Sequence, residues 1–142
     1  MPGKPKTTTV TIIPSLRYSD ASAAIDWLRN AFGFEQQLVV PEDNGAIAHA
    51  QLTFGNGMIM LGSERDVQDD PVERSPNVDV SSAHARYVIV EDADDHFAGA
   101  KAAGADIIME PEDQPYGGRL YACRDLEGNP WYFGTYDPWQ DN

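Results

Sequence analysis

The sequence predicts an α+β fold of two tandem βαβββ modules, which form a curved mixed sheet around a cleft. A strand-like segment leads into an Asp-capped helix twice, at Asp20 and at Asp92, about 72 residues apart. Further strand-like segments follow each helix. The last two, within residues 115–136, are aromatic runs separated by Asp-Leu-Glu-Gly-Asn-Pro, a turn sequence typical of a β-hairpin.

The first module spans residues 10–63. Residues 10–18 alternate and are β-branched at their start, which predicts a strand interrupted by Pro14. Apolar residues from Ala21 onward recur at helical spacing, and Gly33 supplies a stop signal. We expect strands at 35–40, 46–54 and 58–62, the last two joined by the tight Gly-Asn-Gly turn at 55–57.

The second module spans residues 83–136 and repeats this plan. A strand at 83–90 precedes a helix that Asp92 caps and Gly104 ends, and a strand at 107–110 leads to the final hairpin. Trp131 and Phe133 alternate with Tyr132, so we expect them to pack against the second helix. His96, early in that helix, is expected at the solvated surface.

A chain of 142 residues is long enough for one domain with its own core. We expect a single domain over 10–136, with a flexible tail at 1–9, another tail at 137–142 and a linker at 64–82. The linker is rich in acidic residues and poor in large apolar ones.

Charge and cysteine content exclude several classes of protein. The formal net charge is −13 and the pI is about 4.3, which disfavours nucleic acid and anionic membranes as partners. The single cysteine, Cys123, cannot form an internal disulfide and lies in a strand pattern typical of a buried residue.

No apolar run approaches the ~20 residues of a membrane span, so we expect a soluble cytoplasmic protein.

A sheet that carries one helix leaves its other face uncovered, and two such sheets side by side can form a trough lined by every second residue. His49, Gln51 and Thr53 alternate with Ala50, Leu52 and Phe54 in the third strand of the first module. The same alternation would arise if the polar residues faced bulk water.

Several segments resemble the vicinal oxygen chelate superfamily, which includes glyoxalase I, bleomycin resistance proteins and extradiol dioxygenases. They are the opening Leu-Arg-Tyr-Ser-Asp-Ala at 16–21, and residues 31–34, 90–94, 103–105, 116–119 and 125–129. The chain looks like the small glyoxalase-like or PhnB-like branch. This resemblance implies the glyoxalase/bleomycin resistance fold, and it names no reaction or catalytic residue, because the scaffold hosts many activities.

In metal-dependent members, the resemblance places the ligands at Ile13, Gln51, Ala85 and Tyr132 of this chain. Two of these residues have no donor atom, so we expect no metal cofactor. A weak alternative is a divalent metal held through His49 and Gln51, with Glu110 or Glu112.

The resemblance therefore favours a homodimer that binds a small, partly aromatic molecule in the sheet cleft. Arg119 and Tyr121 share one face of their strand. Strand alternation alone does not decide whether that face lines the trough or packs against the helix. The expected ligand-binding residues are Arg17, His49, Gln51, Thr53, Tyr87, Arg119, Tyr121 and Tyr132.

Two other functions compete with this one. The first is a metal-dependent lyase, isomerase or dioxygenase with displaced ligands, in which a carboxylate near the metal acts as general base. The second is a protein-interaction module that uses the acidic residues 64–79 for recognition.

Overall fold

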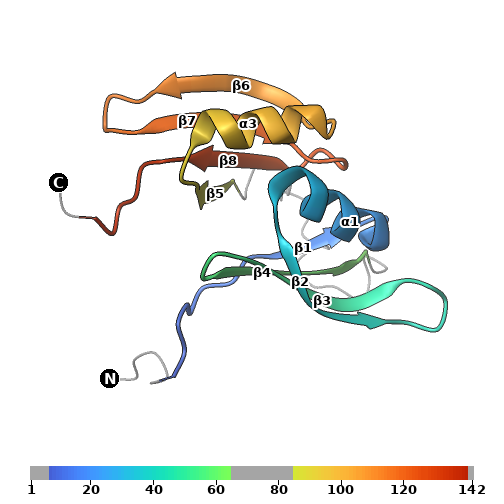
Figure 1. Cartoon of the computed structure of the whole chain (residues 1–142). Helices are drawn as coiled ribbons and strands as arrows, with labels where there is room; N and C mark the ends of the chain where they lie inside the picture. The colour runs from blue at the N-terminus through green and yellow to red at the C-terminus, as the bar shows by residue number, and fades with distance from the viewer. Residues whose placement is uncertain (1–6, 65–84, 141–142) are drawn as a thin grey trace, which may run out of the picture. The chain divides into compact units, whose positions relative to one another are not determined.

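The computed structural model describes residues 7–64 and 85–140. These residues form the element order that the sequence predicts, one βαβββ module followed by another (Figure 1). The elements are β1 (Ser15–Tyr18), α1 (Ala21–Phe32), β2 (Glu35–Pro41), β3 (Ile47–Phe54), β4 (Gly57–Ser63), β5 (Arg86–Ile89), α3 (Ala93–Ala102), β6 (Asp106–Asp113), β7 (Arg119–Arg124) and β8 (Pro130–Gly134).

The chain divides into two compact units. One holds the residues up to Arg29 together with Gly33–Glu64, and the other holds Asn30–Phe32 together with the described residues from 85 onward. The last turn of α1 therefore belongs to the second unit.

The first unit contains a four-stranded mixed sheet in the order β1-β4-β3-β2. The β1 strand pairs with β4 in parallel, and the other neighbours are antiparallel. Asp20 caps α1 by accepting a hydrogen bond of 3.1 Å from the backbone N–H of Ala23. Gly33 ends the helix in the left-handed conformation, at φ 87°, which glycine adopts without steric cost.

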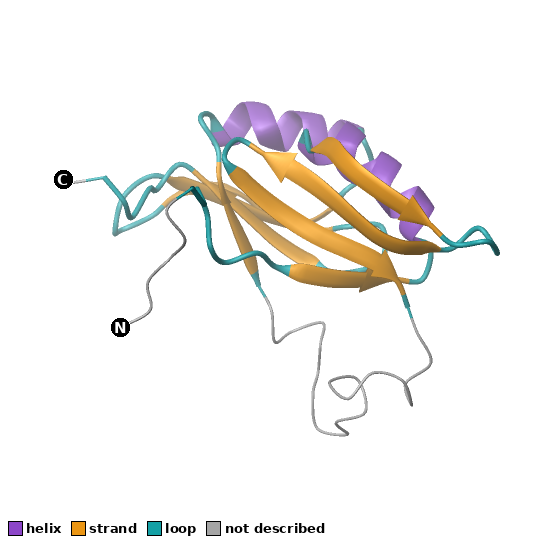
Figure 2. Ribbon diagram, turned by 90° about the horizontal axis from the view of Figure 1, so that it is seen from below, coloured by secondary structure: helices purple, strands orange, loops and turns teal. Residues whose placement is uncertain are grey.

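The second unit repeats this sheet in the order β5-β8-β7-β6, again with one parallel pair, β5 with β8. Asp92 caps α3 through the N–H of Asp95, as Asp20 caps α1. The helix lies against one face of its sheet, which Figure 2 shows with helices in purple and strands in orange. The predicted duplication and fold class are confirmed.

Alternation along the strands builds a core on the helix side of each sheet. Trp131, Phe133, Tyr121 and Cys123 are fully buried in the second unit, which confirms the core positions predicted for Trp131, Phe133 and Cys123. The first-unit core consists of Leu16, Tyr18, Ala21, Ala24, Ile25, Leu28, Phe34, Ile47, Ala50, Leu52, Ile59 and Leu61.

Three predicted strand boundaries were wrong. Residues 10–14 are not a strand, and β1 begins only at Ser15, because proline offers no N–H for sheet pairing. The β5 strand begins at Arg86, and the first two residues predicted for it lie outside the described chain. The β6 strand continues to Asp113 through two irregularities in its register, the second of which, between Met109 and Glu112, accommodates Pro111 at the sheet edge.

Candidate functional site

The face of the first sheet opposite α1, here called the first open face, carries four of the predicted ligand-binding residues. Ala50 and Leu52 are buried towards the helix, so His49, Gln51 and Thr53 lie on the opposite side of β3. Arg17 lies between the buried Leu16 and Tyr18 and therefore points to the same side. The structure thus brings Arg17, His49, Gln51 and Thr53 onto one face.

Apolar side chains share the first open face with these polar ones. Gln51 is flanked by Met60 of β4 and Leu38 of β2, and His49 is paired with Val40. Leu38 and Val40 are each 42% exposed. The face therefore offers both hydrogen-bonding groups and apolar surface, a combination typical of small-molecule sites.

A glycine makes room for Arg17 on this face. Arg17 pairs with Gly62 across the parallel β1–β4 ladder. A β-carbon on Gly62 would lie 2.7 Å from Nη1 of Arg17 and 3.0 Å from the carbonyl oxygen of Ala48. Within the described residues, no ion pair or hydrogen bond engages the Arg17 guanidinium.

His49 and Gln51 contact each other rather than standing as separate groups. Nε2 of His49 lies 2.8 Å from Oε1 of Gln51, and Nε2 of Gln51 donates to Oε1 of Gln37. The sequence interpretation missed Gln37. The one available signal was the polar run Glu35-Gln36-Gln37, which breaks the strand alternation before Leu38.

The face of the second sheet opposite α3, here called the second open face, carries Tyr87 and Tyr132, which are paired across β5 and β8. The ring of Tyr87 lies over Gly134, where a β-carbon would come within 2.8 Å of the Tyr87 hydroxyl. That hydroxyl donates to the carbonyl oxygen of Tyr136. Burial is the main cause that raises the pKa of Tyr87, so it stays a protonated donor near neutral pH.

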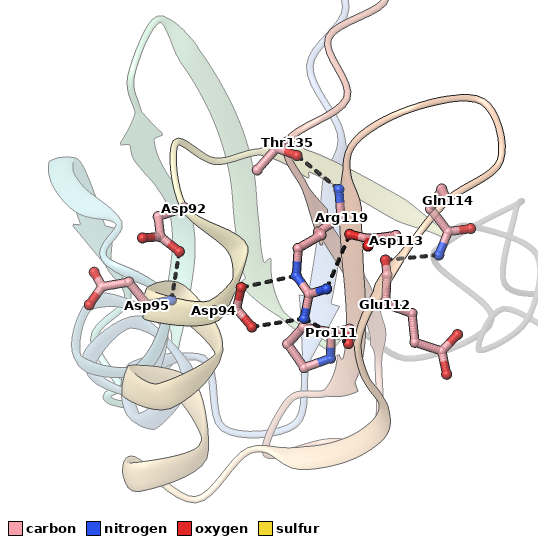
Figure 3. Close-up of polar contacts among 9 residues, drawn as sticks. All are labelled: Asp92, Asp94, Asp95, Pro111, Glu112, Asp113, Gln114, Arg119 and Thr135. Atoms are coloured by element: carbon pink, nitrogen blue, oxygen red, sulfur yellow. Dashed lines mark hydrogen bonds and ion pairs between the residues drawn. The ribbon is translucent and has the colours of Figure 1, made fainter.

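Arg119 and Tyr121 lie on the helix side of the second sheet, away from Tyr87 and Tyr132. Arg119 binds Asp94 of α3 with two hydrogen bonds of 3.0 Å and donates to Oδ1 of Asp113 at 3.1 Å and to the carbonyl of Pro111 (Figure 3). These bonds also raise the pKa of Arg119. The face shared by Arg119 and Tyr121, which strand alternation alone did not decide, is therefore the helix face. Arg119 joins α3 to β6.

The expectation that His96 is solvated surface was wrong. Its Nδ1 is hydrogen-bonded to the hydroxyl of Tyr121, and its Nε2 lies 2.8 Å from the carbonyl oxygen of Phe32. The imidazole also packs 4.3 Å from the ring of Phe133, centroid to centroid. Burial is the main cause that lowers the pKa of His96. His96 is therefore half-buried and packs against the core of the second unit.

The residues at the implied metal positions do not fit a metal ion. Ala85 and Ile13 lack donor atoms, and Gln51 already uses its amide to bind His49 and Gln37. Across residues 7–64 and 85–140, no group of three or more His, Cys, Asp or Glu side chains is placed to hold a metal. Transition-metal sites in proteins need three or four such ligands.

Two further expectations concern other parts of the chain. Except for Glu64, the acidic segment 64–82 lies outside the described residues. Among the helices that the structure describes, none has the length and apolar character to cross a membrane.

The chain is built from two βαβββ units, and each unit carries a helix on one face of its sheet. This architecture places it in the class of small proteins built from paired βαβββ modules. The family model described as Glyoxalase/Bleomycin resistance protein/Dioxygenase superfamily matches residues 9–133. The chain belongs to this superfamily, as the sequence resemblance implied.

Individual proteins are similar to this chain in sequence or in fold. The crystal structure of TioX from Micromonospora sp. ML1 is 34% identical, with a TM-score of 0.69, and the match covers 93% of this chain and 100% of that one. A superfamily member from Sphaerobacter thermophilus shares the fold, at 20% identity and a TM-score of 0.65, over 88% of this chain and 97% of its own. The uncharacterized protein Mb0911c of Mycobacterium bovis is 29% identical over 121 residues, which are 85% of this chain and 80% of that protein.

Proposed function

We propose that this chain binds a small, partly aromatic molecule on its open sheet faces, in the sheet cleft of a homodimer, without a metal cofactor. One observation carries the proposal. The positions that the sequence resemblance aligns with metal ligands hold Ile13, Ala85 and Tyr132 together with Gln51, whose amide is occupied by neighbouring side chains. A scaffold without metal ligands loses the Lewis acid that metal-dependent members use and retains a binding surface.

Exposed apolar and aromatic groups support an aromatic ligand. Tyr87 is 42% exposed, and Tyr132 lies beside it. Leu38 and Val40 are as exposed as Tyr87 on the first open face. Large apolar groups left at a surface favour association with apolar partners, and tyrosine rings also stack on flat ligands.

Polar groups on the first open face would set the orientation of the ligand. Arg17 is a cation that no described residue neutralises, and His49 and Thr53 offer hydrogen-bonding atoms on the same face. A few polar groups within an apolar lining are what small-molecule sites use for specificity.

The experiment measures metal content and ligand binding on the same preparation. Protein purified without chelators should contain far less than one transition metal per chain by elemental analysis. Binding of 2-naphthol, a flat aromatic probe, should raise the melting temperature, because a ligand that binds only the folded state stabilises it. The Tyr87→Ala/Tyr132→Ala double variant should lose this shift, whereas Trp139→Ala, which removes an exposed aromatic residue outside the strands, should keep it.

A stoichiometric metal would favour the alternative function, a metal-dependent lyase, isomerase or dioxygenase with displaced ligands. His49→Ala should then abolish uptake of that metal. Unchanged metal content in His49→Ala would exclude the pair His49 and Gln51 as its ligands. An absent melting shift with 2-naphthol would count against the aromatic-ligand proposal itself.

The homodimer is proposed from the superfamily resemblance, since sheet edges in such folds commonly pair across a two-fold axis. Light scattering at micromolar concentration should give twice the mass of the chain, and the monomer mass would contradict this part of the proposal. We also propose a cytoplasmic location, which fractionation of the native cells would test.

A further inference from the structure

Three side chains form a hydrogen-bonded chain on the first open face. His49 and Gln51, two residues apart on β3, are joined by the 2.8 Å contact between Nε2 and Oε1. The amide nitrogen of Gln51 then donates to Oε1 of Gln37 on the neighbouring strand β2. None of these three side chains makes any other hydrogen bond within the described residues.

A β-bulge brings Gln37 into this series of hydrogen-bonded side chains. Gln36 pairs with Leu52 and Leu38 pairs with Gln51, so Gln37 is the extra residue of β2 at this register shift. A bulge re-aims the side chain of its extra residue. In regular pairing, Gln37 would point to the face opposite that of Leu38, away from Gln51.

The hydrogen bonds among His49, Gln51 and Gln37 determine which ring nitrogen of His49 carries the proton. An amide oxygen has lone pairs and no hydrogen, so Oε1 of Gln51 accepts and Nε2 of His49 donates. Gln37 supports this orientation, because its own Oε1 accepts from the amide nitrogen of Gln51. Neutral imidazole then has its lone pair on Nδ1, and no described residue donates to that atom.

We propose that Nδ1 of His49 is the acceptor that receives a hydrogen bond from the hydroxyl or N–H group of a bound ligand, with Gln51 and Gln37 as positioning residues. This inference rests on the proposed function and adds the chemical class of the ligand, an aromatic molecule that bears a hydrogen-bond donor. Val40, paired with His49 and 42% exposed, provides apolar surface next to the acceptor. The exposed Leu38 does the same next to Gln51.

The first test needs no ligand. Long-range ¹H–¹⁵N spectra are recorded above pH 8 on the full chain, with its histidines labelled with ¹⁵N. They should show His49 in the Nε2–H form. Comparison with the spectrum of His49→Ala assigns the His49 signals. Gln37→Ala should mix the two tautomers, because the Gln51 amide is then free to turn. The matched control Gln36→Ala should leave the tautomer unchanged, since Gln36 pairs with Leu52 and belongs to the other face. A predominant Nδ1–H form in the native protein would overturn the inference.

The second test compares two probes that differ by one donor, 2-naphthol and 2-methoxynaphthalene, by calorimetric titration. The native chain should bind 2-naphthol roughly fivefold to tenfold more tightly, the effect of about one hydrogen bond. The preference should vanish in His49→Phe, which keeps a ring at the position. Equal affinities for the two probes in the native chain would overturn the inference and leave the aromatic-ligand proposal intact. Failure of both probes to bind would instead count against the proposed function.

Discussion

The indole Nε1 of Trp131 donates a hydrogen bond of 3.1 Å to Oδ2 of Asp125, and both residues are almost fully buried. The carboxylate also accepts from the backbone N–H groups of Glu127 and Asn129 and from the Asn129 amide. One side chain thus holds the β7–β8 turn and the largest core residue of the second unit together.

Asp125→Ala should lower the free energy of unfolding by about 3 kcal/mol, because it removes the carboxylate that accepts from the buried Trp131 indole and from the partly buried N–H groups of the turn. Urea unfolding followed by tryptophan fluorescence would measure this loss. Glu91→Ala, an exposed acid between β5 and α3, is the matched control and should change stability by less than about 0.5 kcal/mol. Equal effects of the two substitutions would contradict the role of Asp125.

Gly134→Ala should destabilise the protein through a collision with Tyr87. The new β-carbon would lie 2.8 Å from the Tyr87 hydroxyl and 2.9 Å from its Cε1. Such overpacking costs about 1–3 kcal/mol in proteins. Urea unfolding of Gly134→Ala, Tyr87→Ala and the double variant completes a double-mutant cycle. The double variant should be more stable than the sum of the two single effects predicts. Additive effects would mean that Tyr87 does not occupy the space above Gly134.

His96 should make stability fall as the pH is lowered. Its pKa in the folded protein lies below the ordinary value of 6.5 for histidine, mainly through burial, although the Phe32 carbonyl and the Asp95 carboxylate oppose that shift. The unfolded chain therefore takes up a proton first, so this contribution to stability is complete above pH of about 6.5 and is lost as the pH falls below it. The neighbouring Tyr121 remains protonated throughout, since burial raises its pKa.

The measurement for His96 is the free energy of unfolding between pH 7.5 and about 5.5, in the native chain and in His96→Gln. The native chain should lose more stability over this range, because glutamine has no proton to gain. His49→Gln, at a partly exposed position, is the matched control for a histidine substitution. Parallel pH profiles of the native chain and His96→Gln would contradict the assignment.

Arg119→Lys should lower the melting temperature, because a lysine ammonium cannot reproduce the paired bonds to Asp94 while also reaching Asp113. The loss should shrink at high salt, since the Arg119 side chain is partly exposed. Arg124→Lys, whose single ion pair with Asp106 spans 3.7 Å, is the control and should have little effect. Similar melting temperatures for Arg119→Lys and the native chain would show that the bonds to Asp94 and Asp113 add little.

Local signals in the sequence were sufficient for the repeated plan of elements. The caps Asp20 and Asp92 act through backbone groups three residues away, and the turn after Asp125 closes within a few residues, so neither depends on the rest of the fold. Alternation also placed Arg17, His49, Gln51 and Thr53 on a single sheet face, because the side-chain period of a strand is two residues.

The remaining features depend on contacts between distant residues. The acceptor of the His96 Nε2 hydrogen bond, the Phe32 carbonyl, is 64 residues away in sequence, so helical periodicity gave no sign that this side chain packs against the core. The face occupied by Arg119 and Tyr121 follows from the position of α3, which parity within β7 cannot supply. Gln37 points to the first open face only because the register of β2 against β3 shifts there.

Cys123 should be unreactive in the folded protein despite being a free thiol. It is fully buried, and burial, with smaller contributions from the Asp125 and Asp106 charges, raises the pKa of its thiol to about 12. The thiolate is the reactive form, so little nucleophile is present at pH 8. A disulfide reagent such as 5,5′-dithiobis(2-nitrobenzoic acid) should label the native chain only as fast as it unfolds, and should label it at once in concentrated urea. Rapid stoichiometric labelling of the native chain would show that the strand β7 opens locally, and would contradict the burial of Cys123 in the core of the second unit.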